Sequence, residues 1–194
     1  QLLMGLAALA TVFVYHWTFD WMARALGVLQ HNENAYPLFN LFSHALAFAV
    51  MLPATFLAGI TLPLFTHVLL RGGRGERAIG QVYAANTLGA IAGVLIAVHL
   101  LMPDVGLKVA LIIGAAADML LGAWLLRYSL EAFRRAHAFA AVILGMVAAT
   151  ATARAEILDF ERLSSGVFRY GYGARDSKVF FYRDGKTASV AIRA

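Results

Sequence analysis

Long apolar segments, separated by short polar ones, dominate residues 1–153. The apolar segments cover residues 2–19, 38–70, 78–102, 107–127 and 138–153. The first four are long enough to cross the ~30 Å hydrocarbon core of a bilayer as α-helices, and the fifth is of marginal length. The pattern therefore predicts an all-α polytopic membrane bundle of about five transmembrane helices.

The pattern changes in the tail, residues 154–194, where aromatic and polar residues alternate. Val179 to Tyr182 and Thr187 to Ile192 flank Asp184-Gly185, a pair typical of a tight turn. This arrangement predicts a short β-hairpin outside the membrane. A two-stranded hairpin is only marginally stable in water, so we expect it to need further strands or a partner.

The segment 38–70 is too long for a simple span. Its 33 residues would measure ~50 Å as a straight helix. Pro53 and Pro63 favour a kinked helix or two unequal pieces. A broken helix can mark a binding site in a transporter, and it can equally be a packing kink, so both interpretations stay open.

The segment 78–102 carries 25 residues without a formal charge. Small residues recur along one helical face at every fourth position, namely Ala85, Gly89, Gly93 and Ala97. Such a stripe lets another helix approach closely in lipid. Because only the short turn Pro103–Gly106 separates it from 107–127, we expect these two segments to pack as an antiparallel hairpin along Gly89 and Gly93.

Asp118 lies near the middle of 107–127. A carboxylate there costs ~2.5–3.5 kcal/mol on insertion scales, so it should face the bundle and have a partner or a task. Asn86, Thr87 and His99 on the preceding segment are the expected partners, which makes these four residues a candidate intramembrane polar site. Asp118 is either an ionised group that recognises a cation or a neutral structural hydrogen-bond donor.

Composition supports the membrane assignment and excludes several functions. Hydrophobic residues make up 61% of the chain and charged residues 14%, and the mean hydropathy is +0.71. The absence of cysteine excludes disulfides, thiolate metal sites and a cysteine nucleophile. No catalytic triad, phosphate loop or metal-ligand spacing is present, so we expect no catalytic, cofactor or metal residues. The net charge of +5 includes no basic run typical of nucleic-acid binding.

The charges of the loops predict the orientation. Residues 71–77 and 127–137 carry three arginines each, which places both loops in the cytoplasm by the positive-inside rule. With five spans, the tail 154–194 then lies on the outer face of a bacterial inner membrane. The sequence opens at Gln1 directly into an apolar segment, and we expect it to be part of a longer polypeptide.

Several motifs carry a resemblance to a known family. They are LPATFLAGITLP at 52–63, YAANTLGAIAG at 83–93, the Pro-x-x-Gly turn at 103–106, LSSGVFRYG at 163–171 and VFFYRDGKTASVAI at 179–192. This succession resembles the spermidine synthase-like proteins in which a multi-helix membrane region precedes an aminopropyltransferase domain. The resemblance covers about three quarters of the chain, and the tail would be the start of the synthase domain.

The resemblance implies transfer of an aminopropyl group from decarboxylated S-adenosylmethionine to putrescine by a complete synthase domain. The glycine-rich cofactor turn and the acidic amine-binding residues of that domain are not in this sequence, so this chain alone should not catalyse the transfer. The family tends to carry a neutral amide where Asp118 stands, so the resemblance does not make Asp118 a catalytic residue.

Three classes of function stay open from the sequence. The chain is the membrane anchor of a spermidine synthase-like enzyme, a carrier or sensor of polyamines or other cations, or an accessory membrane subunit that packs against a larger complex. The expected partners are the lipid bilayer and other membrane helices or subunits, with a polyamine as a further candidate.

Overall fold

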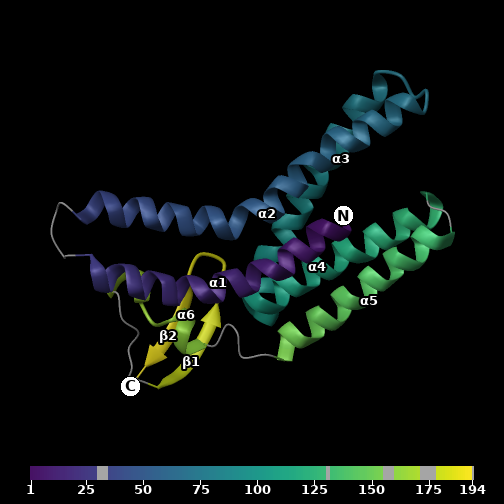
Figure 1. Cartoon of the computed structure of the whole chain (residues 1–194). Helices are drawn as coiled ribbons and strands as arrows, with labels where there is room; N and C mark the ends of the chain where they lie inside the picture. Colours follow the sequence, from purple (N-terminus) through teal and green to yellow (C-terminus); the bar gives the residue numbers. More distant parts are fainter. Residues whose placement is uncertain (30–34, 130–131, 155–159, 171–177, 194) are drawn as a thin grey trace.

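The computed structural model describes residues 1–29, 35–129, 132–154, 160–170 and 178–193. The chain is mostly helical and ends in a two-stranded hairpin (Figure 1). The elements are α1 (Leu2–Val28), α2 (Tyr36–Arg71), α3 (Arg77–Ile96), the π-helix η2 (Ala97–Leu101), α4 (Met102–Ser129), α5 (Ala132–Arg154), α6 (Phe160–Leu163), α7 (Val167–Tyr170), β1 (Val179–Asp184) and β2 (Ser189–Arg193).

Three helical stretches are long and apolar enough to cross a membrane. They are Leu2–Val28, Tyr36–Arg71 and Arg77–Leu126, and Val142–Arg154 is a shorter apolar helix. The predictions of a helical membrane protein and of a C-terminal hairpin are confirmed at this level, whereas five separate spans stay a prediction. Several helices overrun the apolar segments, since α1 continues to Val28 and α5 begins at Ala132.

Helix α2 is a single helix of 36 residues with Pro53 and Pro63 inside it. It bends part-way along its length (Figure 1), as expected where proline removes a backbone hydrogen bond. Its first part packs along α1, and its second part returns through residues 72–76 into α3, against which it packs. The kinked helix is therefore confirmed over the alternative of two separate pieces.

The predicted packing of α3 on α4 is wrong. The chain stays helical through η2, and at Gly106 the backbone takes a non-helical conformation, with φ 78° and ψ 168°. From this region α3 and α4 diverge (Figure 1), so that α3 packs on α2 while α4 packs on α1 and α5. Among the residues that the structure describes, none outside α3 lies within 4 Å of a Cβ atom built on Gly89 or Gly93.

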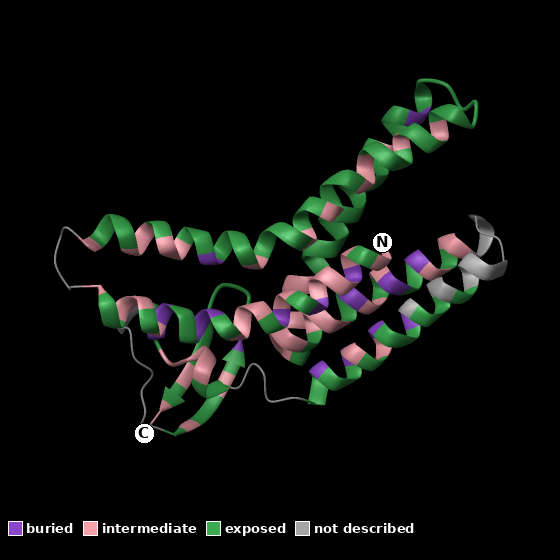
Figure 2. Cartoon of the chain, viewed as in Figure 1, coloured by how far each residue is buried: buried purple, intermediate pink, exposed green. Residues whose placement is uncertain are grey.

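The close packing of small residues lies instead where α1, α4 and α5 meet. A Cβ atom on Gly5 would lie 2.5 Å from Met119 Cγ and 2.7 Å from the Ala115 carbonyl oxygen. Gly145 on α5 faces the same Met119 side chain, which is fully buried. These glycines let three helices approach each other, and Figure 2 shows the buried residues concentrated there while α2 and α3 are mostly exposed.

The tail forms the predicted hairpin. Strands β1 and β2 pair antiparallel, with Asp184 opposite Ser189 and Tyr182 opposite Ala191. Gly185 donates its amide to the Ala188 carbonyl oxygen at 3.1 Å, which closes the connection. Two short helices, α6 and α7, which the sequence did not predict, precede the hairpin.

Candidate functional site

The structure does not bring the four predicted polar residues together. Asn86 lies on α3, and the Thr87 hydroxyl donates to the Tyr83 carbonyl oxygen of its own helix at 2.9 Å. His99 is exposed in η2. In the described part of the chain, no hydrogen bond joins any of them to Asp118. Their role as one intramembrane site stays a prediction.

Asp118 lies on the face of α4 that packs on α1. Gly122, one helical turn further along α4, would place a Cβ atom 2.8 Å from the Leu2 backbone nitrogen. Asp118 itself is half-buried, between the buried Ala115 and Met119. The partner helix of this carboxylate is therefore α1, whereas the sequence led us to expect α3.

A cavity of about 420 Å³ separates the start of α1 from the second part of α2 and from α3. Its walls are mainly apolar and consist of Gln1, Met4, Ala58, Thr61, Leu62, Phe65, Leu69, Val82, Ala85 and Asn86. Two predicted residues, Ala85 and Asn86, thus line a cavity rather than a helix seam. The Thr61 hydroxyl donates a hydrogen bond to the Leu57 carbonyl oxygen at 3.0 Å, so it is not free to bind a ligand. Few polar groups therefore remain in the wall of the cavity.

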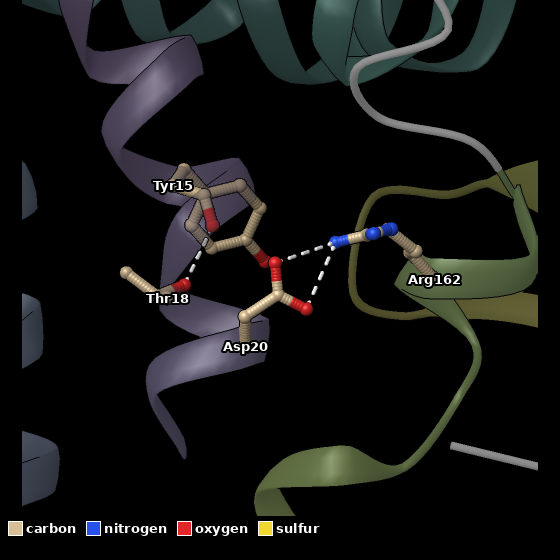
Figure 3. Close-up of polar contacts among 4 residues, drawn as sticks. All are labelled: Tyr15, Thr18, Asp20 and Arg162. Carbon is tan, nitrogen blue, oxygen red and sulfur yellow. Dashed lines mark hydrogen bonds and ion pairs between the residues drawn. The ribbon is translucent and has the colours of Figure 1, made fainter. Parts of the chain in front are cut away.

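A second cavity, of about 350 Å³, lies between α1, α2 and α7. Its lining residues are Tyr15, Thr18, Ser43, Leu46, Ala47, Val50, Met51 and Phe168. The Thr18 hydroxyl donates to the Tyr15 carbonyl oxygen at 2.6 Å within α1 (Figure 3), so this cavity also offers mainly apolar surface.

The most elaborate polar site joins the hairpin to the break in the helices. Asp184, at the end of β1, is only 7% exposed. It accepts hydrogen bonds from the Leu107 amide at 3.0 Å, from the Tyr182 hydroxyl at 2.8 Å and from the Ser189 hydroxyl. Leu107 follows Gly106, where the helix is interrupted, so its amide is one of the donors that a helix start leaves without an internal partner. Asp184 thus caps the helical part of α4 that begins after Gly106, although it lies 77 residues beyond Leu107 in the sequence.

This network keeps Asp184 ionised. Burial raises the pKa of the Asp184 carboxyl, but hydrogen bonds from Ser189, Leu107 and Tyr182 more than offset that effect, so its pKa lies below the ordinary value. Burial also raises the pKa of the Tyr182 hydroxyl, which stays a neutral donor. The negative charge near the start of a helix is electrostatically favourable.

Further contacts fasten the tail to α1. Arg162 on α6 forms an ion pair with Asp20, at 3.3 Å, and reaches both carboxylate oxygens (Figure 3). The rings of Phe19 and Phe168 meet edge to face, with 5.3 Å between their centroids. Phe160 stacks on Tyr182 at 4.7 Å, which joins α6 to the hairpin. The tail is thus attached to the membrane helices at two separate places.

The sequence did not reveal this junction. Asp184 was interpreted as a turn residue, and it does end β1 at the turn, but the same carboxylate also caps α4. The only signal in the sequence was Gly106, which breaks a helix and so creates unpaired amides. Nothing local indicated which distant residue would satisfy them.

The contacts of this junction attach the tail to the helices. The carboxylates of Asp184 and Asp20 are each paired with a donor in the same chain. Among the described residues, no group of three or more His, Asp or Glu side chains is placed to bind a metal ion. Comparisons with protein-family models, with curated proteins and with solved structures find no match.

Proposed function

We propose that this chain is the membrane domain of a spermidine synthase-like protein, which anchors an aminopropyltransferase-type domain and is not catalytic on its own. The motifs YAANTLGAIAG and VFFYRDGKTASVAI support the family. Decarboxylated S-adenosylmethionine and putrescine would bind only to a complete synthase domain.

The bond between Asp184 and the Leu107 amide carries this proposal. It fixes the hairpin to a break in the membrane helices, so that a domain built on the hairpin would be held at a defined place. Phe180, Val190 and Ile192 are exposed on the hairpin, where additional sheet would cover them. A flexible tether would need no buried carboxylate of this kind.

The proposed topology has five spans, with the tail on the outer face of a bacterial inner membrane. Gly106 divides the long stretch Arg77–Leu126 into two segments, which supports separate spans. In Figure 1 the α2–α3 connection and the C-terminal end of α4 lie toward one end of the molecule, and the hairpin lies toward the other. This arrangement agrees with two cytoplasmic arginine loops and an external tail.

An activity measurement tests the proposal. The 194-residue chain and the native polypeptide that contains it are purified in detergent, weighed by mass spectrometry and supplied with decarboxylated S-adenosylmethionine and putrescine. We expect a native mass well above 21.0 kDa and spermidine from the native polypeptide alone. Absence of spermidine from a folded, longer polypeptide would contradict the proposed activity.

The second candidate is an accessory membrane subunit. It is favoured by the exposed apolar surface of α2 and α3, which includes Phe48, Phe56, Leu88 and Ile91. Such a surface faces either lipid or another subunit. A native mass near 21.0 kDa, together with co-purification of a larger membrane complex, would favour this candidate over the anchor.

A further inference from the structure

The α2–α3 hairpin combines an apolar cavity with a cluster of positive charge at one end. The second part of α2 and the whole of α3 are largely exposed, as the green ribbon of both helices shows (Figure 2). The cavity of about 420 Å³ lies along these helices and is walled on its third side by Met4 of α1. The arginines stand at the end where the two helices connect.

The dimensions of the cavity match one leaflet of a bilayer. Along α2 its lining runs from Ala58 to Leu69, which is ~16 Å of helix axis. That is about half of the ~30 Å hydrocarbon thickness. Leu62 and Phe65 lie between these two residues, and Val82 and Ala85 form the facing wall, so the surface available to a ligand is suited to a hydrocarbon chain.

The positive charge lies just beyond the end of the cavity that is nearest the α2–α3 connection. Leu69 is the lining residue nearest the connection, and Arg71 follows it after one residue. Arg71, Arg74 and Arg77 are all exposed, and Glu76 is the single acidic residue in the 71–77 sequence. No salt bridge among the described residues involves these arginines. Three arginines therefore lie at the connected end of the hairpin, beyond the Leu69 end of the apolar cavity.

We propose that the α2–α3 cavity binds one acyl chain of an anionic phospholipid whose phosphate headgroup lies against Arg71, Arg74 and Arg77. Guanidinium groups form paired hydrogen bonds with phosphate oxygens, and basic pockets between membrane helices bind anionic headgroups. Asn86 and Thr61 lie beyond the headgroup region and line the cavity at the depth of the acyl chain. The inference does not depend on the synthase activity.

Lipid binding to the detergent-solubilised chain tests the proposal. Dioleoyl phosphatidylglycerol and dioleoyl phosphatidylcholine are titrated separately, and bound lipid is counted by native mass spectrometry at about 0.15 M salt. We expect the phosphatidylglycerol to bind at least about tenfold more tightly. Equal affinity for the two lipids would overturn the headgroup assignment. Competition by inorganic phosphate alone, at matched ionic strength, would overturn the role of the acyl chain.

Two kinds of variant separate the headgroup from the acyl chain. Replacing Arg71, Arg74 and Arg77 together by Gln should bring phosphatidylglycerol to the level of phosphatidylcholine. The matched control replaces three exposed basic residues outside the cavity, Arg154, Arg183 and Lys186, and should retain the preference. An equal loss in both triple variants would show attraction by net charge alone and would overturn the site.

Filling the cavity tests the acyl chain. Ala85→Phe should weaken binding of both lipids about tenfold while keeping the preference for phosphatidylglycerol. Ala84→Phe, on the neighbouring position outside the lining, is the control and should bind as the parent chain does. Ala58→Phe, on the facing helix, provides a second filling variant, and thermal unfolding without lipid verifies that each variant folds. Unchanged binding in both folded filling variants would overturn the proposal.

Discussion

Asp184 connects two parts of the chain that are far apart in sequence. Its buried carboxylate accepts the Leu107 amide, which the break at Gly106 leaves without a helical partner. Local pattern correctly indicated a strand end and a turn at Asp184. Its second role depends on the three-dimensional position of α4, and no sequence periodicity encodes that position.

The first prediction concerns Asp184→Asn. The amide keeps the shape but loses the charge, so the variant should be less stable by ~1–2 kcal/mol. Hydrogen exchange of a peptide that contains Leu107 should become faster, which reports directly on the lost cap. Asp20→Asn is the control, because it removes an exposed ion pair worth at most ~1 kcal/mol. Unchanged exchange at Leu107 would contradict the capping role.

The lowered pKa of Asp184 gives a second prediction. Its folded-state pKa lies below the ordinary value of ~3.9, so its contribution to stability is complete above that pH and is lost as the pH falls through the folded-state pKa. The unfolding temperature of the parent chain should therefore fall more steeply below about pH 4 than the unfolding temperature of the Asp184→Asn variant. Parallel curves for the two proteins would show that Asp184 does not carry this dependence.

Asp118 allows a third prediction at the same scale. It faces α1 and no hydrogen bond joins it to Asn86, Thr87 or His99 in the described chain, so a structural role is the simpler interpretation. Asp118→Asn should fold normally and leave polyamine uptake by membrane vesicles unchanged. Loss of uptake in the folded variant would instead favour a polyamine or cation carrier.

Among the helices, sequence pattern predicted which segments are apolar but not which faces meet. The stripe of Ala85, Gly89, Gly93 and Ala97 has the spacing of a packing seam, yet a Cβ atom on Gly89 or Gly93 would meet no atom of the described residues outside α3 within 4 Å. Gly5, which has no such repeat around it, and Gly145, which lies in a second repeat of Ala141, Gly145, Ala149 and Ala153, pack closely instead. Small-residue spacing shows that a helix can be approached closely, whereas the bend in α2 and the break at Gly106 decide where each helix goes.

The fourth prediction compares two glycines. Gly5→Leu should destabilise the bundle by ~1–3 kcal/mol or more, because its Cβ would lie 2.7 Å from a backbone oxygen that a rotamer change cannot move. Gly89→Leu should leave the unfolding temperature of the isolated chain nearly unchanged. Thermal unfolding in one detergent checks both, and the opposite order of stability would contradict the packing described here. A Gly89→Leu effect seen only in the native membrane would indicate a partner helix from another chain.

For the whole molecule, the apolar pattern correctly predicted a helical membrane protein with a C-terminal hairpin. It did not predict α6 and α7, which are single turns held by Phe19, Asp20 and Tyr182 rather than by their own sequence. It separated 78–102 from 107–127 at Pro103–Gly106, and the backbone is non-helical at Gly106. Because Arg77–Leu126 is one continuous apolar helical stretch, its division into two spans stays a prediction. The number of spans decides on which side of the membrane the hairpin lies.

Cysteine accessibility measures this directly, because the chain has no cysteine of its own. Gly73→Cys, Ser129→Cys and Lys186→Cys are made singly and treated in intact spheroplasts with a membrane-impermeant thiol reagent. Five spans predict that Lys186→Cys is labelled from outside, while Gly73→Cys and Ser129→Cys react only after the membrane is permeabilised. External labelling of Ser129→Cys, with Gly73→Cys still protected, would mean that Arg77–Leu126 crosses once and would contradict the five-span anchor.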